Sequence, residues 1–131
     1  MKHNAVMLVD DREVDNILHA DKIKKADFAN IVYQSNSAES ALDLLKNLAL
    51  ISTKKENKLP AYIFVDLDMP VMDGIQFLEE FDKMEAFIKD SCRVVMLSAT
   101  MNTDDIREAR ANASLHKFLM KPLNVKDLLA L

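Results

Sequence analysis

Short apolar runs alternate with stretches of helical periodicity along the chain, and few folds accept that order. The apolar runs are continuous rather than alternating, as is typical of strands buried on both faces of a parallel sheet. The predicted strands cover residues 5–9, 31–34, 61–65, 93–97 and 117–120. A helical pattern follows each of them, so the sequence predicts a three-layer α/β domain with a parallel sheet and right-handed crossovers.

The helical stretches are recognised by apolar spacing and by capping residues. Val14, Ile17 and Leu18 form a stripe after the first predicted strand, the pattern of a helix face turned toward a core. Ser37 is the expected N-cap of a second helix, whose apolar residues recur at i, i+3, i+4 spacing. Further helices are expected to open at Gly74, to be capped by Asn102 or Thr103, and to present Val125, Leu128 and Leu129 on one side.

Length, charge and cysteine content narrow the class of protein. The 131 residues suit one domain, which we place at residues 1–131. The net charge of −4 is opposite to that of a nucleic-acid-binding module, so we expect no nucleic acid partner. The single cysteine, Cys92, excludes an internal disulfide and suits a reducing compartment. No apolar run is long enough for a signal peptide or a membrane span, so we expect a cytoplasmic protein without membrane contact.

Glycine is scarce in this chain. Gly74 is the only one, although average usage of about 7% would give roughly nine. Turns that need a positive φ must therefore use other residues, and asparagine tolerates that region better than most. We expect asparagine to take this role at the turns that hold Asn30, Asn36, Asn102 and Asn112.

The chemistry-bearing residues stand directly after the predicted strands, at the edge where function collects in a parallel α/β sheet. Any one of them alone is typical of a turn or a helix cap. Several acids close together would repel one another unless a cation joined them, and an all-oxygen site suits Mg²⁺. A nearby lysine and hydroxyl are groups that a phosphoryl group binds. The residues concerned are Asp10 and Asp11 after the first strand, Asp66 and Asp68 after the third, Ser98 after the fourth and Lys121 after the fifth.

Four motifs lie at these strand ends. They are Val-Asp10-Asp11, Val-Asp66-Leu-Asp-Met-Pro-Val-Met-Asp-Gly74, Leu-Ser98-Ala and Lys121-Pro. Together and in this order they resemble the receiver domain of two-component response regulators, from about residue 5 to the end of the chain. The resemblance implies a flavodoxin-like doubly wound fold, (βα)5, with a parallel five-stranded sheet in the order 2-1-3-4-5.

The resemblance also implies a role for each acid. Asp66 would be the phosphoacceptor, taking a phosphoryl group from the phosphohistidine of a sensor histidine kinase or a phosphotransfer protein. Asp11 and Asp66 would bind Mg²⁺, and Asp10 would do so directly or through water. Asp68 would add its backbone carbonyl as a ligand. The chain would act as a signalling switch that changes its partner-binding surface, not as a turnover enzyme.

Three further residues receive roles from the same resemblance. Ser98 would donate a hydrogen bond to the phosphoryl oxygens, and Lys121 would pair with Asp66 or with the phosphoryl group. The Lys121–Pro122 peptide is expected to be cis. Phe118, three residues before the lysine, stands where receivers carry an aromatic switch residue, although a lone aromatic in a strand is by default a core residue.

Two other functions compete with this interpretation. The Asp66-Leu-Asp68 sequence resembles the DxD signature of haloacid-dehalogenase-like phosphatases, but in that family the DxD follows the first strand and the paired acids come last. A pseudo-receiver would keep the fold as a binding module without being phosphorylated. The presence of Asp11, Asp66, Ser98 and Lys121 together argues against that alternative.

Overall fold

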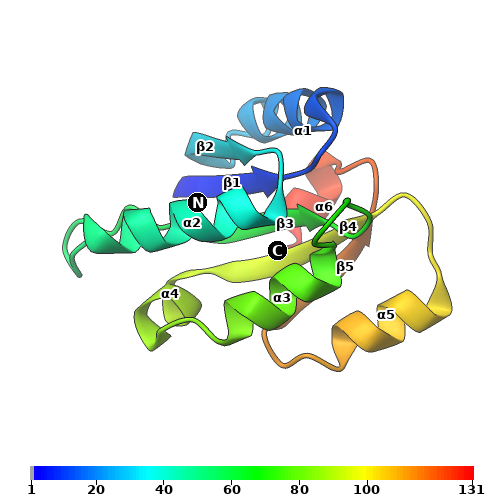
Figure 1. Ribbon diagram of the computed structural model, residues 1–131. Coiled ribbons are helices and arrows are strands. Elements are labelled where there is room, and N and C mark those ends of the chain that lie inside the picture. The colour runs from blue at the N-terminus through cyan, green and yellow to red at the C-terminus, as the bar shows by residue number, and fades with distance from the viewer. Residues whose placement is uncertain (1) are drawn as a thin grey trace.

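Five parallel strands form the central layer of the computed structural model, which describes residues 2–131 (Figure 1). Their order is β2-β1-β3-β4-β5, which confirms the predicted doubly wound sheet. All four neighbouring pairs are parallel, so the carboxyl ends of the strands share one edge. The strands are β1 (His3–Val9), β2 (Ala29–Ser35), β3 (Tyr62–Asp66), β4 (Arg93–Ser98) and β5 (Leu115–Met120).

Helices cover both faces of the sheet, which completes the three layers (Figure 1). One face carries α1 (Glu13–Lys25) and α6 (Val125–Leu129). The other face carries α2 (Ala38–Leu50), α3 (Gly74–Asp82), α4 (Ala86–Ser91) and α5 (Thr103–Arg110). Among residues 2–131, no helix has the length and apolar content needed to cross a bilayer.

The helix α4 was not expected from the sequence, which predicts one helix between each pair of strands. It has six residues, its N-cap residue Glu85 makes no side-chain cap, and Ile88 is its buried residue. Such a short segment carries no apolar periodicity, and that is why the sequence pattern misses it.

The central strands β1, β3 and β4 are buried on both sides, as their continuous apolar runs predict, whereas the edge strands β2 and β5 are partly exposed. Met7 and Val9 of β1 face the layer of α2 and α3, whereas Val6 and Leu8 face the layer of α1 and α6. In β3, Phe64 joins the second of these clusters. This two-sided packing fixes the register of β1 and β3, and therefore the position of the residues that end them.

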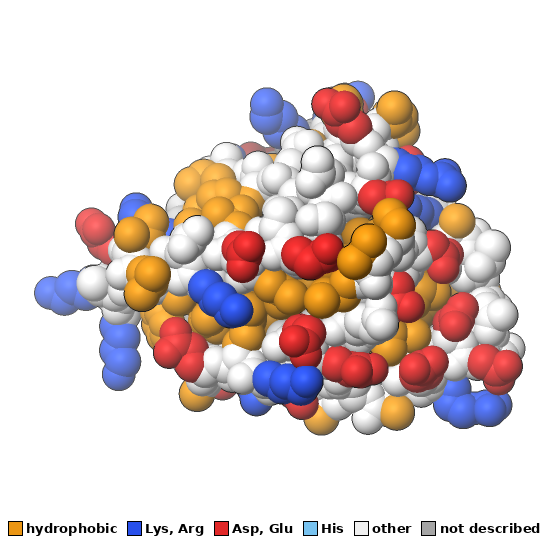
Figure 2. Space-filling view, viewed as in Figure 1, with side chains coloured by type: hydrophobic (Ala, Val, Ile, Leu, Met, Phe, Trp, Pro, Cys, Tyr) orange, Lys and Arg blue, Asp and Glu red, His pale blue; other side chains and the backbone are white. Residues whose placement is uncertain are grey.

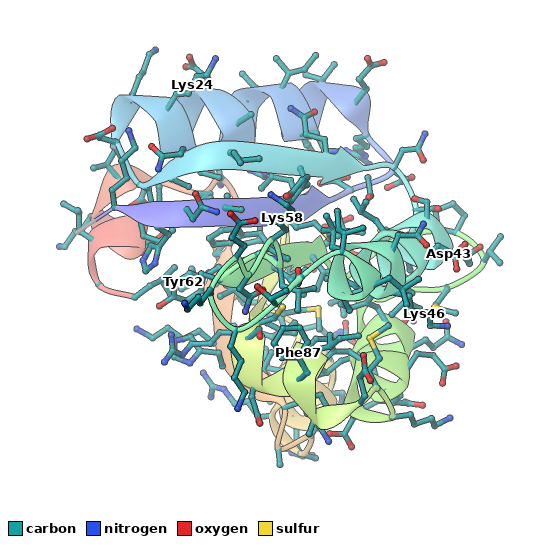
Figure 3. All side chains as sticks on the ribbon, turned by 90° about the vertical axis from the view of Figure 1, so that its left-hand side faces the viewer. Lys24, Asp43, Lys46, Lys58, Tyr62 and Phe87 are labelled. Carbon is teal, nitrogen blue, oxygen red and sulfur yellow. The ribbon has the colours of Figure 1, made fainter. Side chains whose placement is uncertain are left out.

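The face of α1 that contacts the sheet differs from the prediction. Val14, Ile17 and Leu18 are 66%, 55% and 56% exposed, so the stripe that they form points away from the core. The buried residues of α1 are Asn16, His19 and Ile23. Figure 3 shows α1 lying along β2 and β1, with Lys24 on its outer side.

A polar anchor explains the orientation of α1. The Asn16 side-chain amide donates hydrogen bonds to the carbonyl oxygens of Asp10 (3.2 Å) and Ser35 (3.1 Å), at the ends of β1 and β2. Because the buried Asp10 carbonyl needs a donor, this contact holds the Asn16 side of the helix against the sheet. The prediction failed because it ranked α1 positions by hydrophobicity alone.

The backbone positions with positive φ are also not those predicted. Among residues 2–131, the non-glycine residues with positive φ are Asp27 (51°) and Val71 (69°). The asparagines use their side chains instead: Asn102 caps α5, and Asn112 accepts a hydrogen bond from the Ser114 amide. A β-branched residue is strained in this region, and Val71 lies in the exposed loop after β3.

An apolar groove lies between α2 and the α3–α4 segment, as the space-filling view shows (Figure 2). Its volume is about 460 Å³, and it is flanked by charged side chains. The lining residues come from the second half of α2, the end of α3 and α4, which lie toward the amino ends of the strands. They include Leu42, Lys46, Leu50, Lys83, Met84 and Ile88.

Gly74 is required for its size rather than for a positive φ. It opens α3 after the N-cap Asp73, whose capping box with Gln76 fixes the start of the helix. A Cβ atom at Gly74 would lie 2.5 Å from the Met96 sulfur and 2.7 Å from the Asp66 carbonyl oxygen. The helix start therefore packs directly on the residue that ends β3.

Replacing Gly74 with alanine is expected to destabilise the protein. The new methyl group would push α3 away from the end of β3, and overpacking of this kind costs about 1–3 kcal/mol. Urea unfolding followed by circular dichroism measures the change in the free energy of unfolding. A Gly74→Ala variant as stable as the wild type would show that the contacts relax without cost.

Candidate functional site

Lys121 is the centre of a buried ion cluster at the carboxyl edge of the sheet. Its ammonium nitrogen lies 2.7 Å from Asp10 Oδ2 and 3.0 Å from Asp66 Oδ1. A third carboxylate, Asp15 Oδ2 from the first turn of α1, lies 2.9 Å from the same nitrogen. The Lys121 side chain is 12% exposed, so these contacts are shielded from water. Asp15 is not among the site residues predicted from the sequence, because it lies inside a helix rather than at a strand end.

Asp10, Asp11 and Asp66 form an acidic group beside the lysine. One ligand atom of each lies within 4.8 Å of the others. Asp10 and Asp66 are buried, and Asp11 is exposed at the rim. Three carboxylates so close together suit a hard divalent cation, because carboxylate oxygen is the preferred donor of Mg²⁺. The topology thus brings together the acids that follow β1 and β3, as predicted.

Asp68 lies apart from this group. It is exposed in the loop after β3, and in the described residues the acidic group does not include its carboxylate. The predicted metal ligand at this position is the backbone carbonyl of Asp68, not its side chain. That assignment stays a prediction.

Ser98 ends β4 and is completely buried. Its hydroxyl donates a hydrogen bond to the Thr100 carbonyl (2.5 Å) and accepts one from the Thr100 amide (3.2 Å). In this structure the Ser98 hydroxyl therefore makes its hydrogen bonds within its own loop, to the backbone of Thr100. The Ser98 carbonyl accepts a hydrogen bond from the Lys121 amide (2.7 Å), which ties the end of β5 to the end of β4.

Lys121 and Phe118 lie at and just before the end of β5. The Lys121–Pro122 peptide is cis, as predicted. Phe118 pairs with Met96 of β4 and is 7% exposed, within the core on the side of α2 to α5. The aromatic ring is therefore a core residue in this structure, and its role as a switch stays a prediction.

The ion cluster shifts the pKa values of its members in opposite directions. Burial, with a smaller contribution from the Asp10 charge, raises the pKa of Asp66 to about 6, against the opposing effect of the hydrogen bond from Lys121. The hydrogen bond from Lys121 holds the pKa of Asp15 below its usual value. Burial disfavours the Lys121 ammonium, but its bonds to the three carboxylates outweigh that effect and hold its pKa above the usual value. The lysine is charged throughout the physiological range.

The chain resembles proteins of known family and known structure. The family model described as "Response regulator receiver domain" matches residues 6–131. A response regulator from Cytophaga hutchinsonii has 23% identity and a TM-score of 0.89, with 99% of this chain and 94% of that chain covered. A response regulator receiver protein from Dyadobacter fermentans has 28% identity and a TM-score of 0.79, with 93% and 89% covered. The "Probable methanogenesis regulatory protein FilR2" of Methanothrix harundinacea is 26% identical over 94% of this chain and 75% of its own length.

The chain therefore belongs to the response regulator receiver domain family. Receiver domains are signalling switches that bind Mg²⁺ at an aspartate cluster and interact with histidine kinases or phosphotransfer proteins. This assignment, with the order of the acids along the chain, removes the phosphatase alternative.

The raised pKa of Asp66 predicts how stability depends on pH. The folded protein keeps a proton on Asp66 up to about pH 6, whereas the unfolded chain releases it near 3.8. Because the folded state binds more protons between these values, Asp66 makes stability fall as pH rises from about 4 to about 6. Asp66→Asn lacks this titration. In metal-free buffer, its free energy of unfolding relative to the wild type should rise across that interval and then level off.

Urea unfolding at a series of pH values in the presence of a chelator provides the test. The wild type and Asp66→Asn are compared at each pH. A stability difference between them that does not vary from pH 4 to pH 7 would contradict the raised pKa.

Proposed function

We propose that this chain accepts a phosphoryl group on Asp66 from the phosphohistidine of a histidine kinase or phosphotransfer protein. The phosphoryl group then changes a partner-binding surface. The observation that carries the proposal is the position of Asp66, a buried carboxylate 3.0 Å from the Lys121 ammonium and grouped with Asp10 and Asp11. A nucleophile placed between a cation and a metal-binding acid pair suits phosphoryl transfer.

The transfer is an in-line displacement at phosphorus. A carboxylate oxygen of Asp66 forms the new O–P bond while the N–P bond of the donor phosphohistidine breaks, and the imidazole leaves with the electron pair. Asp66 must be ionised to attack, and its pKa of about 6 leaves it charged at neutral pH. The N–H groups of Lys121 then stabilise the negative charge that develops on the phosphoryl oxygens.

Asp10, Asp11 and Asp66 would hold Mg²⁺, with the Asp68 carbonyl as a further ligand. When bound, Mg²⁺ neutralises charge on the phosphoryl oxygens and offsets the repulsion among the acids. The protein contributes the positions of these donors, which the ends of β1 and β3 fix.

The switch would begin at Ser98. Its hydroxyl is bonded to Thr100 here and would have to leave that carbonyl to reach a phosphoryl oxygen. A hydrogen bond to a charged group is worth about 1.5–3 kcal/mol, enough to shift a two-state ratio tenfold or more. Movement of Ser98 would open space beside β4, into which Phe118 would turn. Phe118 is already buried, so its packing contacts rather than its exposure would change.

The first prediction concerns the nucleophile. Incubation with acetyl phosphate and Mg²⁺ should add one phosphoryl group that is labile in base, as expected of an acyl phosphate. Asp66→Asn should remove this labelling and Asp68→Asn, the matched control, should retain it. Intact-protein mass spectrometry provides the measurement. Labelling of Asp66→Asn that maps to Asp68 would overturn the assignment, and an unlabelled wild type would favour a pseudo-receiver.

The second prediction concerns the metal. Millimolar Mg²⁺ should raise the melting temperature by roughly 3–8 °C, because it binds the folded state and relieves repulsion among the acids. Asp11→Asn should lose most of this gain. Asp43→Asn removes a carboxylate on the exposed side of α2 and should respond like the wild type. An undiminished response in Asp11→Asn would place the ion elsewhere.

The third prediction separates phosphorylation from switching. Ser98→Ala should still be phosphorylated on Asp66, because the hydroxyl takes no part in the attack. It should lose most of the phosphorylation-dependent change in the ring resonances of Phe118, observed by NMR with labelled phenylalanine. The full change in Ser98→Ala would disprove a coupling between the serine and the ring.

A further inference from the structure

We propose that Asp15 is a positioning residue, which holds the Lys121 ammonium in place when the metal and the phosphoryl group engage the other carboxylates. This inference rests on the proposed function. It assigns a role to a residue of α1 that belongs to neither the acidic group nor a strand end.

The ammonium of Lys121 is surrounded by carboxylates: it donates hydrogen bonds to Asp10 and Asp15 and forms an ion pair with Asp66. A lysine side chain carries three N–H donors and no acceptor. The three carboxylate oxygens, from Asp10, Asp15 and Asp66, lie 2.7, 2.9 and 3.0 Å from the nitrogen. An incoming phosphoryl oxygen therefore competes with these three carboxylates for the ammonium.

Asp10 and Asp66 are the two partners of Lys121 that also take part in other interactions. Both belong to the acidic group that suits a divalent cation. The second oxygen of Asp10 also accepts a hydrogen bond from the Arg12 amide (3.0 Å). Phosphorylation would convert the Asp66 carboxylate into an acyl phosphate, whose carbonyl oxygen no longer shares a carboxylate charge and is a poor acceptor for an ammonium. Both of these bonds to Lys121 would thus weaken during the reaction.

Asp15 keeps its bond through every step. Among residues 2–131, the hydrogen bonds of its carboxylate go to Lys121 alone. Its side chain is 26% exposed, against 3% for Asp10 and 6% for Asp66, so its charge is the least costly of the three to maintain. Because α1 is anchored on the sheet through Asn16, the carboxylate has a fixed position. The long side chain of Lys121 would then turn one N–H from Asp66 to the phosphoryl group.

A purely structural role for Asp15 is the competing explanation. It lies in the first turn of α1, where any acid is stabilised by the helix dipole. That effect does not depend on the lysine. The two explanations therefore differ in whether the consequence of removing Asp15 vanishes when Lys121 is also removed.

The test compares Asp15→Asn with the wild type and with Asp21→Asn. Asp21 lies on the same helix and pairs with Lys25 at the surface, so its variant removes an equal charge away from the site. In saturating Mg²⁺, Asp15→Asn should be phosphorylated by acetyl phosphate about two- to fivefold more slowly than the wild type, the range expected for one partly exposed ion pair. Asp21→Asn should match the wild type.

A double-mutant cycle in the same Mg²⁺ buffer tests the coupling without relying on phosphorylation. The loss of unfolding free energy caused by Asp15→Asn should disappear in a Lys121→Met background. A wild-type phosphorylation rate in Asp15→Asn, or an equal loss in both backgrounds, would overturn the proposal. A wild type that is not phosphorylated would instead count against the proposed function, and the cycle would still decide whether the pair persists with Mg²⁺.

Discussion

The ammonium of Lys121 makes it possible to bury two carboxylates at the edge of this sheet. Charged groups lose several kcal/mol of hydration when they are buried, and they remain charged only if partners replace the water. Lys121 is such a partner, because its ammonium forms ion pairs with Asp10, Asp15 and Asp66. The lysine cannot fully satisfy four nearby acids, since Asp11 stands at the rim of the same group. The surplus negative charge is what makes the site suited to a divalent cation.

The rest of the fold places the members of this cluster. The register of β1 and β3 brings Asp10 and Asp66 side by side, and Gly74 lets α3 begin directly against the carbonyl of Asp66. The Lys121 amide bonds to the Ser98 carbonyl, so the lysine and the serine hydroxyl share one strand pair. A charge change on Asp66 therefore reaches β4 and β5 through adjacent residues. This short path is the physical basis for a switch.

The sequence predicted those parts of the fold that strong local patterns encode. Buried strands are recognisable in the sequence as continuous apolar runs. The acids that follow these strands could be predicted as one cluster because parallel strands end at the same edge of the sheet. The orientation of α1 escaped prediction because the polar Asn16, not the apolar Val14 or Leu18, anchors the helix. Asp15 was not predicted for a related reason: its partner Lys121 lies 106 residues away along the sequence, and only the folded chain brings the two together.

Unfolding of a Lys121→Met variant, without and with Mg²⁺, tests the central role of the ammonium. The substitution keeps a long side chain and removes the charge. Without metal at neutral pH, the free energy of unfolding should fall by about 3 kcal/mol, because buried carboxylates lose their partner. Saturating Mg²⁺ should restore much of this loss by supplying positive charge to the same acids. A variant as stable as the wild type, or a loss that Mg²⁺ does not reduce, would contradict the account.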